Sequence, residues 1–252
     1  MKKTFLILLA LITAGAHALS DQKMQTELAA ANAACEQRDY STAYQKYEFL
    51  AQAGYPEAQH LLARMYLKGL GVVQDSGQAI TWYEKAATQG YANSQTVLGW
   101  FYLKGRGVST DYGKAREWLE KAAAQGNRVA QSGLGLLYLE GKGGKKDYVR
   151  AREWLEKAAA QGAVDAKVTL GVMYLAGYGV AKDSAKAKEW WEKAAMQGNA
   201  DAQFRLGYLY ATGEGTAKDL AKAREWLEKS AAQKNQDAID TLNMLLDSDK
   251  KL

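Results

Sequence analysis

Several residue types that build common functional sites are nearly missing from this chain of 252 residues. There is one cysteine, which excludes an intramolecular disulfide. With only two histidines, a zinc cluster of cysteine and histidine ligands is excluded, and histidine catalysis would depend on very few residues. One proline among 24 glycines excludes collagen-like and proline-rich disordered chains and favours helices separated by glycine turns. We therefore expect no cofactor and no metal.

The chain also lacks a strong charge of either sign. It has 33 basic and 28 acidic residues, for a net charge of +5. This small excess gives no argument for nucleic-acid binding. Beyond the first 20 residues we find no segment apolar enough to span a membrane, so we expect a partner that is neither nucleic acid nor lipid.

The N-terminal segment is typical of a secretory signal peptide. Lys2 and Lys3 give a basic start, an unbroken apolar run covers residues 5–12, and Ala16-His17-Ala18 is a small-x-small cleavage site. The alternative, a membrane anchor, is disfavoured because a spanning helix needs about 20 apolar residues. The sequence predicts a signal peptide over residues 1–18 and a mature protein that is periplasmic or secreted.

The rest of the chain repeats itself every 36 residues. Five sets of residues keep this step, and a shared period of this length indicates a repeat architecture. The sets are Asp39, Asp75, Asp111, Asp147, Asp183 and Asp219; Trp82, Trp118, Trp154, Trp190 and Trp226; Gly54, Gly90, Gly126, Gly162 and Gly198; Gly69, Gly105, Gly141, Gly177 and Gly213; and Tyr66, Tyr102, Tyr138, Tyr174 and Tyr210.

Each repeat predicts two helices. In the unit that begins at Asp111, the aspartate can cap the first helix, and apolar residues then recur at i, i+3, i+4 and i+7. Gly126 ends this helix, because glycine adopts the left-handed conformation at low cost. The second helix carries Gly135, whose recurrence in other units predicts a close helix–helix contact. The lone Pro56 fits the first turn of a helix.

The unit D-x-x-x-A-x-x-W-x-E-K-A-A-x-Q-G followed by A-Q-x-x-L-G-x-x-Y-x-x-G-x-G resembles the Sel-1-like repeat (SLR), a tetratricopeptide-like family. The resemblance implies an all-α protein, a right-handed α/α solenoid of thirteen helices. We expect an N-terminal capping helix over 19–38, a solenoid over 39–247 with about five full repeats and a degenerate last one, and a flexible tail over 248–252. Degenerate ends are typical of capping repeats.

The sequence signals for a catalytic or ligand-binding site are weak. The GxG strings follow helices and recur in every full unit, so they favour turns over phosphate loops. Two S-x-x-K strings, at residues 20–23 and 248–251, leave open a β-lactamase-like hydrolase, although both lie at the predicted flexible ends. Cys35 on the stripe of the capping helix is predicted to be a small buried residue, with a Cys35-linked dimer of the otherwise monomeric protein as the alternative.

The repeated tryptophans lie beside alanine and leucine at helical spacing, which favours core packing over ligand stacking. The repeated Glu and Lys residues are predicted to form a solvated face.

One face of the second helices does not repeat. Two neighbouring columns vary among units where the structural residues are constant, and several of their side chains are large. The tetratricopeptide resemblance places these columns on the inner, concave surface, where they would form a partner-binding groove. The alternative is that they only fill inter-helix space. The columns are His60, Thr96, Ser132, Val168 and Phe204, and Arg64, Trp100, Leu136, Val172 and Tyr208.

The sequence therefore predicts an exported, non-enzymatic scaffold that binds a protein or peptide of unknown identity. Within this class we expect a periplasmic inhibitor of a secreted toxin (an immunity-type protein) or an envelope-assembly adaptor. The alternatives are a cell-wall-directed hydrolase and a secreted factor that binds host proteins.

Overall fold

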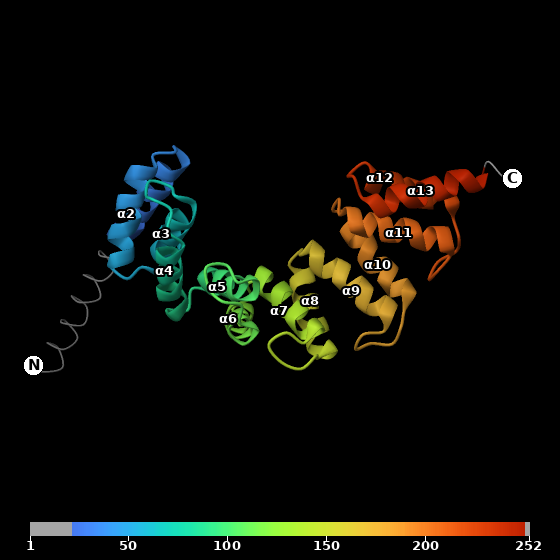
Figure 1. Cartoon of the computed structure of the whole chain (residues 1–252), viewed down its shortest axis with the longest axis horizontal. Coiled ribbons are helices and arrows are strands. Elements are labelled where there is room, and N and C mark those ends of the chain that lie inside the picture. The colour runs from blue at the N-terminus through green and yellow to red at the C-terminus, as the bar shows by residue number, and fades with distance from the viewer. Residues whose placement is uncertain (1–21, 250–252) are drawn as a thin grey trace, which may run out of the picture. The chain divides into compact units, whose positions relative to one another are not determined.

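The computed structural model describes residues 22–249, with side chains up to residue 245 (Figure 1). The predicted signal peptide and residues 250–252 lie outside the described residues. All regular secondary structure between residues 22 and 249 is helical, and thirteen helices occur there. The predicted all-α solenoid fold is therefore confirmed.

The helices follow the repeat. Residues 22–36 form the first helix, where the capping helix was expected. The others are α2 (Tyr40–Gln52), α3 (Pro56–Lys68), α4 (Ser76–Thr88), α5 (Ala92–Lys104), α6 (Tyr112–Ala124), α7 (Arg128–Glu140), α8 (Tyr148–Ala160), α9 (Val164–Ala176), α10 (Ser184–Ala195), α11 (Ala200–Thr212), α12 (Leu220–Ala231) and α13 (Gln236–Asp249).

The chain divides into two compact units, one up to Asp111 and one from Tyr112 onward. In the first unit, α2 packs against α3, α3 against α4 and α4 against α5. Its core around the first helix pair contains Leu28, Tyr47, Leu50 and Leu62, each almost fully buried. Burial of such side chains contributes about 1.5–3 kcal/mol each and holds the helix pairs together.

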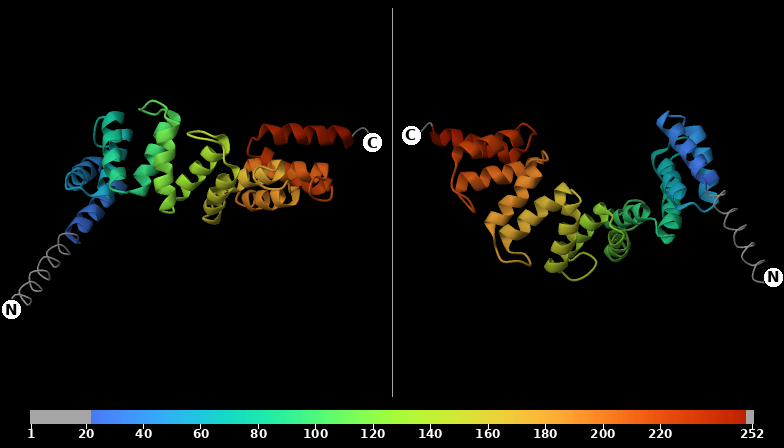
Figure 2. Two further views of the ribbon diagram at one scale, coloured as in Figure 1. Left: turned by 90° about the horizontal axis from the view of Figure 1, so that it is seen from below. Right: turned by 180° about the vertical axis from the view of Figure 1, so that it is seen from behind.

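The second unit repeats the same packing from α6 to α13, each helix lying against the next. The red helix α13 lies along α11 and α12 (Figure 2). The core between α10 and α11 contains Trp191, Leu206 and Leu209, which are about 1% exposed or less. Because every helix buries one stripe against its neighbours, the opposite stripe is free to vary.

Aspartates start the first helix of the repeats as predicted. The side chain of Asp147 accepts a hydrogen bond from the backbone N–H of Arg150 at 3.0 Å, and that of Asp183 accepts one from Lys186 at 2.9 Å. Such caps satisfy amides that have no partner within the helix and contribute about 1 kcal/mol each. Pro56 is the first residue of α3, also as predicted.

Glycine ends the second helix of each repeat. Gly141 closes α7 in the left-handed conformation, with φ of 74°. A different glycine set follows the first helix of each repeat, and after α12 Lys234 stands where the preceding unit has Gly198 and keeps a φ of 64°. A side chain in this conformation costs about 1–2 kcal/mol, which indicates that the turn geometry is imposed by the packing on either side.

The glycine within the second helix has the predicted packing role. A Cβ atom on Gly135 would lie 2.6 Å from Cγ of Leu155, and one on Gly207 would lie 2.6 Å from Cγ of Leu227. Helices α7 and α8, and likewise α11 and α12, therefore approach too closely for any side chain at these positions.

Candidate partner-binding site

In the first unit the two variable columns divide into buried and accessible residues. His60 and Thr96 are only 9% and 7% exposed, whereas Arg64 is exposed and Trp100 is half-buried. Nδ1 of His60 lies 2.9 Å from Oγ of Ser94, and its ring packs edge-on against Tyr83. Burial lowers the pKa of His60 to about 4, so the imidazole is neutral at pH 7. Of the four column residues in this unit, Arg64 and Trp100 are thus the two that a partner could contact.

In the second unit the columns lie on α7, α9 and α11. Ser132, Leu136, Val168 and Val172 are half-buried. Val168 and Val172 pack against the core around Trp191. For these two residues the alternative interpretation, that the columns fill space between helices, therefore holds. Phe204 is also half-buried, and Tyr208 is 48% exposed.

Phe204 and Tyr208 line a pocket with a volume of about 200 Å³. Their ring centroids are 6.4 Å apart, at an interplanar angle of 49°. The remaining walls come from Leu175 of α9, Trp191 of α10, and Arg205 and Leu209 of α11. This pocket brings together two of the predicted partner-binding residues and four that the sequence analysis did not single out.

The missed residues left a signal in the sequence. Trp191 stands where the other units of this half of the chain carry Leu119, Leu155 and Leu227, and it is fully buried. Arg205 stands where the preceding unit has Thr169. Trp191 thus departs from a position that is otherwise leucine in this half of the chain, whereas the position of Arg205 varies from unit to unit and gives a weaker signal.

The repeated tryptophans are half-buried rather than core residues. A lysine three positions later places its Nζ over each ring, at 3.8–4.5 Å from the ring centroid. Each cation–π contact of this kind contributes about 0.5–1 kcal/mol at an exposed site. The Trp and Lys residues therefore pair with each other on the outer surface of the first helices. The lysines are exposed, as expected.

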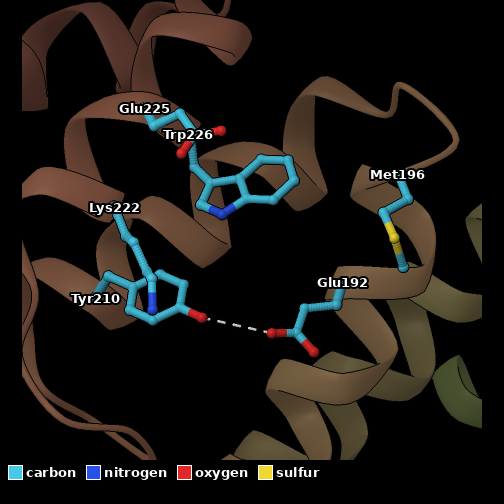
Figure 3. A pocket seen from close by; sticks show the side chains of 6 residues that line it. All are labelled: Glu192, Met196, Tyr210, Lys222, Glu225 and Trp226. Atoms are coloured by element: carbon cyan, nitrogen blue, oxygen red, sulfur yellow. Dashed lines mark hydrogen bonds between the residues drawn. The ribbon is translucent and has the colours of Figure 1, made fainter.

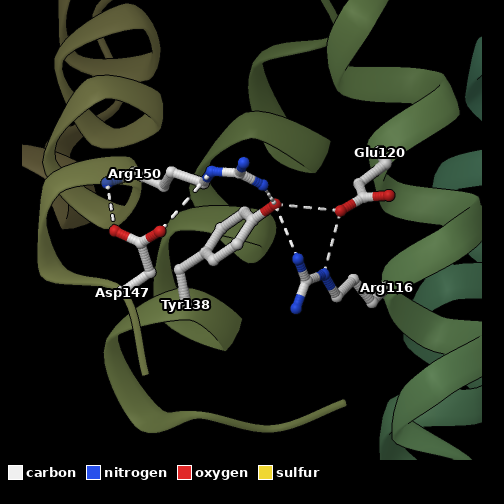
Figure 4. Close-up of polar contacts among 5 residues, drawn as sticks. All are labelled: Arg116, Glu120, Tyr138, Asp147 and Arg150. Atoms are coloured by element: carbon white, nitrogen blue, oxygen red, sulfur yellow. Dashed lines mark hydrogen bonds and ion pairs between the residues drawn. The ribbon is translucent and has the colours of Figure 1, made fainter. Parts of the chain in front are cut away.

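A polar cluster surrounds Tyr138 in the second unit (Figure 4). The tyrosine hydroxyl accepts hydrogen bonds from Nη2 of Arg116 at 2.8 Å and Nη1 of Arg150 at 3.1 Å, and it donates to Oε1 of Glu120 at 3.0 Å. Its hydrogen-bonding capacity is then used up. The neighbouring carboxylate of Glu120 raises the pKa of Arg116, and the hydroxyl of Tyr138 raises that of Arg150. This cluster ties α6, α7 and α8 together.

The position 72 residues later is more open (Figure 3). Tyr210 stands at the position of Tyr138, and Lys222 at that of Arg150. The hydroxyl of Tyr210 donates a long hydrogen bond, 3.5 Å, to Oε1 of Glu192. A shallow pocket of about 380 Å³ remains, lined also by Met196, Glu225 and Trp226. Glu192 pairs with Lys188, and Glu225 pairs with Lys229, so the carboxylates already have cationic partners.

The remaining sequence expectations concern Cys35, metal binding and the two S-x-x-K strings. Cys35 is half-buried and packs against the core of the first unit. Within the described residues there is no group of three side chains placed to hold a metal ion. Lys23 and Ser248, one residue from each S-x-x-K string, lie within helices, and Ser20 and Lys251 lie outside the described residues. No helix in the described part of the chain is long and apolar enough to cross a membrane.

Comparison with known proteins identifies relatives of the same architecture. A repeat protein from Oxalobacter formigenes is 34% identical and has a TM-score of 0.80, with 86% of each chain covered. A protective antigen of uropathogenic Escherichia coli, c5321, is 34% identical with a TM-score of 0.83 over 88% of this chain. The match covers 48% of that antigen, so this chain spans about half its length.

An immunity protein of Pseudomonas aeruginosa, PA5088, shares the fold at 22% identity and a TM-score of 0.53, with 82% of each chain covered. No curated protein matches the chain. The family model described as Sel1 repeat matches five consecutive segments, residues 56–91, 92–127, 128–162, 165–199 and 200–235. The Asp, Trp, Gly and Tyr ladders, the paired helices and these matches agree, and the chain belongs to the Sel1 repeat family.

Proposed function

We propose that this protein is an exported, non-enzymatic scaffold that binds a partner protein through the variable columns of its second helices. One observation carries the proposal. In repeats whose structural residues are constant, large side chains that differ from unit to unit remain accessible at Arg64, Trp100, Phe204 and Tyr208. Trp, Tyr and Arg are the residues that most often dominate binding energy at protein interfaces.

The signal-peptide pattern of residues 1–18 supports export to the periplasm or beyond. The E. coli relative is a protective antigen, which is consistent with a protein that leaves the cytoplasm. Fractionation of cells that express the full chain tests this location. Recovery of the uncleaved chain in the cytoplasm would contradict it, and recovery in the medium would favour the secreted, host-binding alternative over the periplasmic one.

Within the scaffold class, we favour an inhibitor of a secreted toxin or an envelope-assembly adaptor. The fold shared with the P. aeruginosa immunity protein is compatible with either role and does not choose between them. A gene for a secreted toxin beside the gene for this chain, and protection from that toxin by this chain, would support the inhibitor. Turnover of a β-lactam or a cell-wall fragment by the purified chain would instead establish the hydrolase alternative.

The partner-binding role is tested by mutation. The mature chain, residues 19–252, is immobilised, and a partner captured from envelope extracts is purified and titrated against variants. Trp100→Ala is expected to weaken binding by roughly 2 kcal/mol or more, because a tryptophan at an interface is often a hot spot. Melting curves run in parallel show whether each variant remains folded.

Trp82→Ala is the matched control. Trp82 is also half-buried and lies in the same unit, but it belongs to the Trp and Lys surface, where Lys85 lies over its ring at 3.8 Å. It is expected to change binding by less than about 0.5 kcal/mol. If Trp82→Ala abolishes binding and Trp100→Ala does not, the first helices carry the working surface and the proposed columns are wrong.

A further inference from the structure

The pocket between α9 and α11 has a composition that points to its occupant. Tyr208 and Phe204 form one side, Leu175 and Leu209 complete the apolar walls, and the indole of Trp191, only 1% exposed, forms the base. The only charged side chain that lines it is Arg205. The pocket is thus a small apolar site with one cation at its wall.

Its volume sets the size of what it can hold. Pockets that bind drug-sized molecules have roughly 300–1,000 Å³, whereas this one has about 200 Å³. A single large side chain matches this space better than a whole small molecule. Aromatic walls favour an aromatic or long aliphatic side chain, because rings that stack offset or edge-to-face add about 0.5–1.5 kcal/mol beyond the area they bury.

The guanidinium of Arg205 is incompletely paired. Its Nη2 lies 3.8 Å from Oδ2 of Asp201, longer than a hydrogen bond, and its Nε is buried without a hydrogen-bond partner. The side chain is 35% exposed, so its outer nitrogens can be reached from the pocket side. Trp191 lies beneath the guanidinium, 5.4 Å from the ring centroid to Cζ, and holds it in place. A carboxylate is the acceptor that a guanidinium fork fits best.

We propose that this pocket binds a segment of the partner protein in which a large apolar side chain, such as phenylalanine, is flanked by acidic side chains. The apolar side chain enters the pocket and packs against the rings of Phe204 and Tyr208, and a neighbouring glutamate or aspartate replaces Asp201 as the partner of Arg205. The inference rests on the proposed function and adds to it the chemistry that the partner must present.

Three blocked peptides test this chemistry directly. They are acetyl-Gly-Glu-Phe-Glu-Gly-amide, the same peptide with both Glu replaced by Gln, and the same peptide with Phe replaced by Ala. Binding is followed by NMR at the indole N–H of Trp191, which donates to the carbonyl of Val168 at 3.0 Å. Trp191→Leu, which installs the residue that three equivalent positions carry, identifies this signal by its loss, and a melting curve shows that the variant is folded.

The first peptide is expected to give a saturable shift, the Gln peptide a dissociation constant at least threefold higher, and the Ala peptide no saturable shift. Arg205→Met keeps the aliphatic stem and is expected to bind the Glu and Gln peptides equally. Arg128→Met on α7 removes an arginine away from the pocket and is expected to keep the preference. Tyr208→Ala is expected to weaken the Glu peptide at least fivefold.

No saturable shift with the Phe peptides, or equal affinity for the Glu and Gln peptides on the unmodified protein, overturns the inference. These outcomes are separate from the test of the proposed function. If a captured partner depends on Trp100 while the peptides fail to bind, the scaffold role stands and the pocket chemistry is wrong. If the peptides bind as described while a captured partner depends on Trp82 and on neither Trp100 nor Tyr208, the pocket chemistry stands and the proposed function is wrong.

Discussion

A single missing side chain sets the distance between helices at Gly135. Any Cβ atom there would overlap Leu155, and the carbonyl oxygen of Ala151 would lie 3.2 Å away. At the corresponding point between α9 and α10, a Cβ on Gly171 would overlap the indole of Trp191. Glycine thus costs about 1 kcal/mol of helix propensity in α7 and allows close packing that repays it.

Gly135→Leu is expected to overpack this contact and destabilise the protein by about 1–3 kcal/mol. Thermal melting followed by circular dichroism measures the change. Ala160→Leu, at an exposed position near the end of α8, is the control and is expected to shift stability by no more than about 0.5 kcal/mol. An unchanged melting temperature for Gly135→Leu would show that α7 and α8 tolerate a larger separation.

His60 makes the first unit sensitive to acid. Its folded pKa of about 4 lies below the 6.5 of an unperturbed histidine because burial disfavours the charged ring. The neutral ring therefore adds stability that is fully present above pH 6.5 and is lost as the pH falls toward 4. The loss can reach about 3 kcal/mol, at 1.36 kcal/mol per pKa unit.

We expect His60→Gln to lose less stability than the unmodified chain between pH 7 and pH 4.5. Carboxylates that titrate in this range are common to both proteins, so the difference isolates His60. An NMR titration of the imidazole gives the pKa itself. The rings of Tyr83 and Tyr91 both lie 5.3 Å from the imidazole, centroid to centroid, and a pKa near 6.5 would mean that the ring is solvated and that this packing is absent in solution.

At the scale of the helix, equivalent positions differ in how firmly they join neighbouring elements. Tyr138 connects α6, α7 and α8 through three hydrogen bonds of its hydroxyl. Tyr174, one repeat later, packs against the core around Trp191 with Nζ of Lys186 5.5 Å from its ring centroid, and its hydroxyl makes no hydrogen bond within the described residues. Only one of the surrounding cations differs in type: Lys186, a single compact charge, replaces the five-donor fork of Arg150, whereas Arg152 repeats Arg116 and pairs with Glu156 at 3.8 Å.

Tyr138→Phe is expected to destabilise the protein by about 1 kcal/mol, since it removes the acceptor of two charged donors. Tyr174→Phe is the matched control and is expected to be nearly neutral. Denaturant titration of both variants gives the two values. Equal effects would show that water replaces the hydroxyl of Tyr138 without cost, and that the cluster in Figure 4 contributes no stability.

At the scale of the whole molecule, the sequence predicted the architecture and less of the site. The 36-residue period fixes where helices start and stop, because the caps, stripes and glycines recur together. It also identified Tyr208 and Phe204 as unusual. It could not show that His60 is buried beneath two tyrosines, or that lysines cover the repeated tryptophans, since both depend on side-chain contacts between segments far apart in sequence.

Repeat proteins are stabilised by contacts between neighbours, so their ends are the least stable parts. In the second unit, α13 packs mainly against α12 and α11 at the end of the described helices, whereas α9 lies between α8 and α10. We expect backbone amides of α13 to exchange with deuterium at least tenfold faster than those of α9. Mass spectrometry of peptides from both helices measures the rates, and equal protection would indicate a single cooperative block.

The near identity of successive units has a consequence for the gene. Ala-Arg-Glu-Trp-Leu-Glu-Lys occurs at residues 115–121, 151–157 and 223–229, and where the codons of these segments also match, the coding DNA offers sites for unequal recombination. An exchange between the segments of α6 and α8 removes 36 codons in frame and joins the start of α6 to the end of α8. The side chain of Gln161 reaches Gln131 and the carbonyl of Gly126, and Gln233 makes the same bonds to Gln203 and Gly198. Two junctions thus use the same bonds, so a chain that has gained or lost one repeat can reuse them, and the solenoid can change length by whole repeats in one genetic event.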